Sequence, residues 1–331
     1  MSYIKIGDSN PKYLAATDIL IGDMSGINYE FLLFDRPIIL LANKWLRHNF
    51  PDIGIKTDID SLEMSISTSI ARPKDYARQR NNWLKKTMHL PDGKSSNRVI
   101  DTVLTYSKLA NPFVLLLHGY DEVLKTHLDP LYEALKTRGI NVVYAAIYNK
   151  KWNVHKDNLV CISAHNAFLE KIPFGYKVHI DHSVRGVGTG DYEHCLQSYM
   201  KNKYFPLVDL HITEGEVSNS ETKKLLGPYH DRSVMVGYTK SDTLLKLNTQ
   251  ENKMSVYKEL GFDPSKPLIT YAPAGKYSYP SKQGASLSKE TINKIKDIAS
   301  RNDYNLLIKL KYHRSAIIWQ AISKLRRYLP T

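Results

Sequence analysis

The chain has 331 residues, 42% of them hydrophobic, and 46 Lys and Arg against 33 Asp and Glu give a formal net charge of +13. This composition excludes a disordered protein, and the presence of only two cysteines, Cys161 and Cys195, excludes a disulfide-stapled scaffold. The positive charge favours a polyanionic partner, such as a nucleic acid, an anionic lipid surface or a phosphorylated substrate.

Short apolar runs alternate with helical patterns along the chain. We predict a strand at 18–22, a helix at 27–34 that Arg36-Pro37 ends, and a strand at 38–42. A second unit has a strand at 114–117, a helix that begins at Asp129-Pro130 and ends at Gly139, and a strand at 141–146. A helix around Ile292, Ile295 and Ile298 leads to a strand at 306–310. This alternation is typical of an α/β protein with parallel sheets flanked by helices.

The apolar runs are too short to cross a membrane. The longest, at 113–117 and 37–42, are far below the length of about 20 residues that a spanning helix needs. We therefore predict no transmembrane helix, and the N-terminus has no apolar segment typical of a secretory signal.

The turn after the first predicted strand is a candidate phosphate site. Residues 22–31 follow the strand and open a helix, whose start offers free backbone N–H groups and the positive end of its dipole. Gly26 lets the backbone approach a ligand closely, and the Ser25 hydroxyl is a further donor. The alternative is that Ser25 only caps the helix.

A second glycine-rich turn, at 186–190, follows the predicted strand that contains His179. It lacks the dinucleotide-binding pattern, because Asp191 stands where the third glycine belongs. His182 and Arg185 lie beside the turn, and a histidine near a strand end is a candidate general base. The alternative is that each histidine has a structural role.

Several other functions are disfavoured by the spacing of residues. His118-Gly119 follows a strand, as at the opening of an α/β-hydrolase, but the chain contains no Gly-x-Ser-x-Gly. It contains neither the Cys/His spacing of a zinc site nor a P-loop. The basic stretch 78–86, which includes Trp83, is interpreted as the solvated face of a helix, and we predict no nucleic-acid partner.

Four segments together resemble one family. They are 16–27 with Glu30-Phe31 and Arg36-Pro37; 236–244, Val-Gly-Tyr-Thr-Lys-Ser-Asp-Thr-Leu; 269–273, Ile-Thr-Tyr-Ala-Pro; and 92–99, Asp-Gly-Lys-Ser-Ser-Asn-Arg-Val. In that order they resemble the donor-domain turn, the inter-domain segment, the opening of the donor domain and the closing helix of the CDP-glycerol glycerophosphotransferases. This family builds the polyol-phosphate polymers of teichoic-acid type in cell walls.

The resemblance implies two Rossmann-like domains that face a cleft, the GT-B arrangement. It implies transfer of a glycerol-phosphate or similar polyol-phosphate unit from a CDP-polyol donor to a hydroxyl of a lipid-linked or polymeric acceptor, with release of CMP and without a cofactor or metal ion. His182 would be the general base, and Lys311 or His313 would neutralise the leaving phosphate oxygens.

The remaining implied contacts are with the donor and with the acceptor. The donor-side residues are Asp23, Ser25, Gly26, Glu30, Tyr271, Ala272, Pro273 and Lys309. The acceptor-side residues are His179, Arg185, Gly186 and Gly188. For Glu30, the alternative is a solvated carboxylate.

Two motifs depart from the family pattern. The family's His-Gly-x-x-x-Lys-x-x-Gly is approximated only by 182–188, and its Lys-Leu-His-Pro becomes 309–314, where the histidine is displaced to His313 or replaced by Lys311. One alternative is therefore a non-catalytic relative that binds a membrane or a polyanion. The other is a GT-B sugar transferase or an enzyme similar to UDP-sugar 2-epimerases.

The segments stand in circularly rotated order. We predict that 1–106 is the C-terminal half of the donor domain, 107–250 the acceptor-side domain, and 251–331 the N-terminal half of the donor domain, which pairs with 1–106. A circular permutation and a slice of a longer multi-module protein both explain this order.

The implied location is the cytoplasm, with peripheral attachment to the anionic inner face of the membrane. The basic residues of the acceptor half that suit this attachment are Lys150, Lys151, Lys201, Lys203, Lys223 and Lys224.

Overall fold

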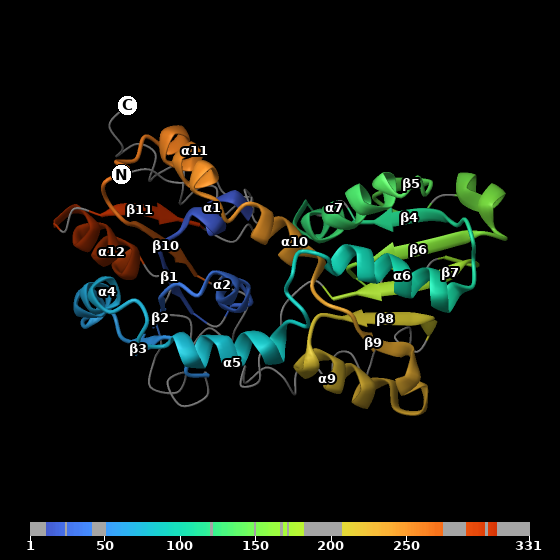
Figure 1. Ribbon diagram of the computed structural model, residues 1–331, viewed down its shortest axis with the longest axis horizontal. Coiled ribbons are helices and arrows are strands. Elements are labelled where there is room, and N and C mark those ends of the chain that lie inside the picture. The colour runs from blue at the N-terminus through green and yellow to red at the C-terminus, as the bar shows by residue number, and fades with distance from the viewer. Residues whose placement is uncertain are drawn as a thin grey trace.

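The computed structural model describes residues 11–23, 25–41, 51–119, 122–148, 150–165, 168–170, 172–181, 207–273, 289–301 and 304–309. These residues form two lobes, each built on its own sheet (Figure 1). All strand pairs between the described strands are parallel, and helices cover the sheets. The predicted α/β class with parallel sheets flanked by helices is therefore confirmed, and the two lobes have the layered form of Rossmann-like domains.

The described strands of the first lobe form a five-stranded sheet in the order β11-β10-β1-β2-β3. They are β1 (Ile19–Gly22), β2 (Ile38–Leu41), β3 (Ile55–Thr57), β10 (Leu268–Ala272) and β11 (Asn305–Ile308). Gly22 of β1 lies opposite Ala272 of β10, so segments far apart in the sequence share this sheet. The strands are nearly continuous apolar runs because both faces of a parallel sheet are covered.

Alternate residues of the first sheet pack against different helices. Leu20 belongs to a core with α2, α5 and α10, whereas Ile19 and Ile21 pack with α4 and α12. Leu268 and Leu307 pack with α1 and α11. The helices of this lobe are α1 (Pro11–Ala16), α2 (Ile27–Phe31), the 3-10 helix η1 (Leu32–Phe34), α4 (Leu62–Ala71), α5 (Ala77–Thr87), α10 (Thr239–Lys246), α11 (Gln250–Leu260) and α12 (Lys289–Arg301).

The described strands of the second lobe follow the order β5-β4-β6-β7-β8-β9. They are β4 (Phe113–Leu117), β5 (Val142–Ala145), β6 (Leu159–Ser163), β7 (Tyr176–Ile180), β8 (Leu210–Thr213) and β9 (Ser233–Met235). Leu116 packs against α6 (Ser95–Ser107) and α7 (Glu122–Thr137), and Leu115 packs on the other face with the 3-10 helix η2 (Lys150–His155). Between β8 and β9 lie α9 (Glu216–Leu226) and the 3-10 helix η5 (Gly227–Arg232).

The predicted start of one helix is wrong. Helix α7 begins at Glu122 rather than at Asp129, and Pro130 lies inside it. Leu124 and Leu128 are buried and extend the apolar stripe of the helix toward its N-terminus. The free energy gained when this stripe is buried outweighs the cost of the helical hydrogen bond that Pro130 cannot donate. The end is as predicted, because Gly139 follows the helix with φ 72°.

Helix α10 lies between the two lobes in Figure 1, whereas α6 covers the sheet of the second lobe. Val99, Ile100 and Val103 of α6 pack in the core of the second lobe, whereas Leu244 of α10 packs in the core of the first. The domain boundaries at 106/107 and 250/251, the rotated order and the GT-B arrangement stay predictions.

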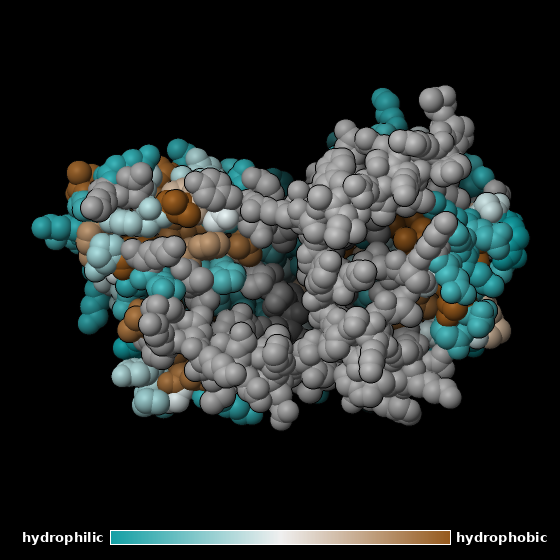
Figure 2. Space-filling model, turned by 180° about the vertical axis from the view of Figure 1, so that it is seen from behind, coloured by the Kyte–Doolittle hydropathy of each residue, from teal (hydrophilic) through white to brown (hydrophobic). Residues whose placement is uncertain are grey.

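The surface of the described residues mixes hydrophilic and hydrophobic side chains on both lobes (Figure 2). Exposed apolar side chains such as Met64 on α4, Val154 on η2 and Met254 on α11 lie on separate elements. Single exposed apolar residues are normal for a protein surface. Within the described part of the chain, no helix has both the length and the apolar composition needed to span a bilayer.

Candidate functional site

The carboxyl ends of β1, β10 and β11 bring several predicted donor-side residues together. Gly22 is level with Ala272, and Tyr271 is level with Ile308, so Asp23, Pro273 and Lys309 follow the ends of three adjacent strands. The backbone N–H of Lys309 donates to the carbonyl oxygen of Tyr271 at 2.9 Å. The sheet thus places residues from three separate segments at one edge.

This edge contains the point where the sheet changes its winding direction. The connection from β10 to β11 carries α12 on one face, whereas the connection from β1 to β2 carries α2 on the other. The two connections thus leave adjacent strands β1 and β10 in opposite directions. In open α/β sheets, ligands bind at such a switch point.

The turn between β1 and α2 is held by hydrogen bonds within itself. The backbone N–H of Ser25 donates to the carbonyl oxygen of Asp23 at 2.8 Å, and the N–H groups of Tyr29 and Glu30 donate to that of Gly26 at 3.0 and 3.2 Å. The Asn28 amide also donates to the Asp23 carbonyl. Ser25 and Gly26 are half-buried, so the turn remains accessible. Since α2 has five residues, its dipole is small, and the turn itself is the more important feature.

Tyr271, one of the predicted donor-side residues, has its side chain in the core. It is fully buried among residues of α4 and α12. Burial, and then the charge of Asp23, raise the pKa of the Tyr271 hydroxyl well above its usual range. Ala272 and Pro273 are buried at the same strand end. Lys309 is half-buried at the same edge, and its charge contributes to the lowered pKa of Glu30.

Glu30 is neither solvated nor open to a ligand, because two side chains from another element engage it. The Lys240 ammonium donates to both carboxylate oxygens at 2.8 and 3.0 Å, and the Tyr238 hydroxyl donates to Oε1 at 2.7 Å. Burial favours the neutral acid, but the charge and hydrogen bond of Lys240, together with Tyr238 and Lys309, hold the pKa of Glu30 below its usual value. Glu30 is therefore a buried carboxylate of an ion pair.

The same network reaches the second lobe through α7. The Tyr238 hydroxyl lies 3.2 Å from Nδ1 of His127, and the Thr239 hydroxyl donates to the carbonyl oxygen of His127 at 2.7 Å. Tyr238 donates its one hydroxyl proton to Glu30. In the contact with His127, the protonated Nδ1 of the histidine is therefore the donor and the Tyr238 oxygen is the acceptor. Burial and the charge of Glu30 raise the pKa of the Tyr238 hydroxyl well above its usual range, so it remains a donor.

On the second sheet, His179 lies in the interior near the carboxyl end of β7. It is level with Ser163 of β6 and His211 of β8, and the two histidine rings are 5.5 Å apart. Both rings are buried, and Asp181 directly after β7 is also buried. The predicted residues His182, Arg185, Gly186, Gly188, Lys311 and His313 lie outside the described residues.

The roles of Tyr238, Lys240 and His127 were not predicted from the sequence. Tyr238 and Lys240 belong to the segment 236–244, whose pattern alone indicated an inter-domain position. No local signal indicates His127, because its partner Tyr238 is 111 positions away.

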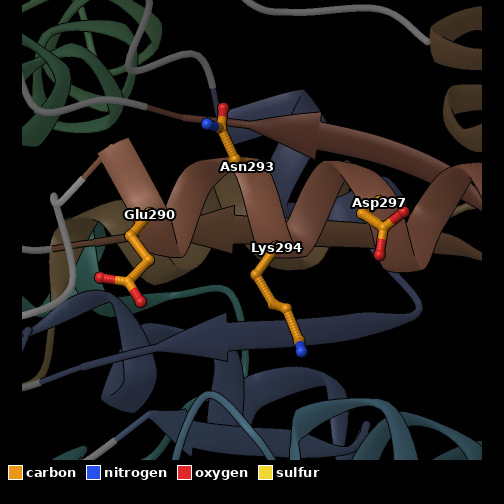
Figure 3. Close-up of a pocket in the computed structure, with 4 residues that line it drawn as sticks. All are labelled: Glu290, Asn293, Lys294 and Asp297. Carbon is orange, nitrogen blue, oxygen red and sulfur yellow. The ribbon is translucent and has the colours of Figure 1, made fainter.

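An open depression on the surface of α12 does not add to this site. It is lined by Glu290, Asn293, Lys294 and Asp297, which Figure 3 shows along a single helix. These exposed positions follow the pattern i, i+3, i+4 and i+7, which is typical of the solvated face of an amphipathic helix.

Comparison with known proteins finds one family model that matches part of the chain. Residues 3–105 match the family described as CDP-Glycerol:Poly(glycerophosphate) glycerophosphotransferase. The resemblance is thereby confirmed over about the first third of the chain, which contains the β1–α2 turn and Glu30. The family supports transferase chemistry of the CDP-glycerol type in general, with a CDP-polyol donor and an acceptor. No curated protein and no solved structure matches the chain.

Proposed function

We propose that the protein transfers a glycerol-phosphate or similar polyol-phosphate unit from a CDP-polyol donor to a hydroxyl of a lipid-linked or polymeric acceptor. The observation that carries the proposal is the family match over 3–105, which includes the turn at the switch point of the first sheet. The carboxyl-end residues of that sheet supply a place for the donor.

In the proposed reaction, the acceptor oxygen attacks the phosphorus that carries the polyol. A new P–O bond forms to the acceptor, the P–O bond to the CMP phosphate breaks, and CMP leaves with the electron pair. The hydroxyl proton passes to a general base, for which His182 is the candidate. This displacement needs positive groups near the oxygens of the leaving phosphate.

The candidate donor contacts are divided between described and undescribed residues. Lys309, half-buried after the end of β11, is a candidate contact for a donor phosphate, and the half-buried Ser25 and Gly26 of the adjacent turn are further candidates. Lys311 and His313 follow Lys309 in the sequence and are the candidates for the leaving phosphate oxygens. Glu30 is left out of the donor contacts, because Lys240 and Tyr238 occupy its carboxylate.

The acceptor and the location of the protein are part of the same proposal. A lipid-linked acceptor would lie at the inner membrane face, and anionic lipids there attract exposed lysines such as Lys151, Lys223 and Lys224. Val154 is 80% exposed next to the basic end of η2 and suits insertion between headgroups. We expect binding to vesicles that contain phosphatidylglycerol, and we expect salt to weaken it.

The test follows nucleotide release in the presence of a lipid-linked polyol-phosphate acceptor: CMP from CDP-glycerol or CDP-ribitol, and UDP from UDP-N-acetylglucosamine. We expect CMP from one of the CDP-polyols, and we expect the rate to fall at least about 100-fold in the His182→Ala variant. His230→Ala is the matched control, because His230 is exposed on η5. Turnover of the UDP-sugar alone would favour a sugar transferase, and no turnover of any donor would overturn the proposal.

A further inference from the structure

Within the described residues, the chain passes between the lobes at two adjacent places. The first passage connects α5 to α6, and the second connects β9 to α10. The Asp242 carboxylate accepts hydrogen bonds from the backbone N–H groups of Ser95 at 3.0 Å and Ser96 at 2.7 Å. The Arg98 guanidinium donates to the carbonyl oxygen of Val236 at 2.9 Å and so ties the two passages together.

Both passages contain backbone of a kind found at hinges. Leu90 and Gly93 have φ of 43° and 78° in the first passage, and Gly237 has φ of 125° in the second. Two neighbouring connections define an axis about which two lobes can rotate, and hinge motions are absorbed by a few such residues. The geometry of the connections alone therefore leaves the angle between the lobes adjustable.

A buried polar network lies beside these passages and contacts both lobes. Glu30 belongs to the first lobe, His127 to the second, and Tyr238 lies between them with contacts of 2.7 and 3.2 Å. Lys240 completes the network on the first-lobe side at 2.8 Å from Glu30. As whole residues, the four are at most 7% exposed.

Such a network is satisfied at one lobe angle only. A hydrogen bond is lost when its donor and acceptor separate by about 1 Å beyond normal contact. Rotation of one lobe would separate Tyr238 from either Glu30 or His127 and leave a buried polar group unpaired, which is costly. We propose that Glu30, Lys240, Tyr238 and His127 form a latch that holds the two lobes at one angle and thereby act as positioning residues for transfer.

The part of this inference that concerns transfer rests on the proposed function. A donor held at the first sheet and an acceptor and base held at the second must meet in line, with reacting atoms about 3 to 3.5 Å apart. An error of about 1 Å in such placement can reduce the rate about 100-fold. The latch would therefore affect the rate without touching either substrate.

The test measures the lobe angle directly and compares two buried tyrosines. Tyr238→Phe removes the hydroxyl that joins the lobes. Tyr257→Phe is the matched control, because the Tyr257 hydroxyl contacts Asp18 at 3.2 Å and the Lys266 carbonyl at 3.1 Å within the first lobe. Both rings are 1% exposed.

Spin labels on exposed positions report the distance between the lobes. Cysteines replace Met64 on α4 and Val154 on η2, which are 69% and 80% exposed, in a background with Cys195→Ser. In double electron–electron resonance we expect the distance distribution of Tyr238→Phe to be at least about twice as wide as that of the parent. Tyr257→Phe should keep the parent distribution. Equal widths in the two variants, or an unchanged Tyr238→Phe, would overturn the latch.

A second variant and an activity measurement complete the test. Thr239→Val removes the bond to the His127 carbonyl and should broaden the distribution even if Tyr238→Phe fails to fold. With CDP-glycerol as the probe, kcat/KM of Tyr238→Phe should fall at least about tenfold, with near-normal binding of CDP-glycerol. An inactive parent with the expected difference in distance distributions would refute the proposed function and leave the latch supported. An active parent whose variants keep the parent distribution would refute the latch and leave the proposed function supported.

Discussion

Lys240→Met should be among the most destabilising single substitutions in this protein. The side chains of Lys240 and Glu30 are 8% and 9% exposed, and their closest atoms are 2.8 Å apart. Methionine has a similar length and no charge, so Glu30 would remain buried without its cation. Removal of one partner from such a pair costs about 3 to 5 kcal/mol of free energy of unfolding. With an unfolding entropy of about 2.1 cal/mol/K per residue, this corresponds to a fall of about 4 to 7 °C in melting temperature.

The effect should depend on pH, with a sign that follows from Glu30. In the parent the pKa of Glu30 is lowered below 4.5, so its contribution to stability is complete above the unfolded pKa and is lost as pH falls through the folded pKa. Without Lys240, burial dominates and raises the pKa of Glu30. The ionised form then destabilises the variant at pH 7, and protonation relieves this penalty as pH falls. The difference in stability should therefore narrow from about pH 7 to about pH 5.

Circular dichroism melts at the two pH values measure the effect, and two further variants control it. Lys253→Met breaks the ion pair between Lys253 and Asp18, whose charged atoms are 2.6 Å apart. Because these two side chains are 25% and 27% exposed, the loss of this pair should cost about 1 kcal/mol of free energy of unfolding or less. Lys240→Met with Glu30→Gln removes both charges and should recover about 1 to 3 kcal/mol. A parent-like melt of Lys240→Met, or a double variant less stable than Lys240→Met alone, would refute the reasoning.

Three further outcomes follow from single contacts. Arg80→Met should lower the free energy of unfolding by about 1 to 3 kcal/mol in urea denaturation, because the buried guanidinium donates to the carbonyl oxygens of Asp35 and Pro73 at 3.2 and 3.1 Å as well as to the half-exposed Asp35 carboxylate; an unchanged free energy of unfolding would contradict this. Burial raises the pKa of the Cys161 thiol to about 12, so iodoacetamide at pH 8 should modify the Cys161 peptide only in denaturant, as mass spectrometry would show. Gly237→Ala should cost more than about 1 kcal/mol of free energy of unfolding in a thermal melt, because φ is 125° and the added Cβ would lie 2.8 Å from the Ser95 hydroxyl oxygen. An unchanged melting temperature would contradict the positive φ at this position.

The sequence by itself determined the α/β class and most of the elements it was used to predict. The runs at 18–22, 38–42 and 114–117 correspond closely to β1, β2 and β4. A short, continuous apolar run between two helical patterns is typical of a parallel strand that is covered on both faces. The resemblance was also local, since it rested on short segments, and the family match over 3–105 covers two of them.

Only the tertiary structure decided which distant residues meet. Glu30 and Lys240 are 210 positions apart, and neither residue type indicates by itself that it is buried against the other. The pairing of β1 with β10 and the start of α7 before Pro130 likewise depend on which apolar faces cover one another. Local patterns specify what each segment can form, whereas the partner of a buried charge is set by packing across the whole chain, because the penalty for leaving it unpaired arises only once water is excluded.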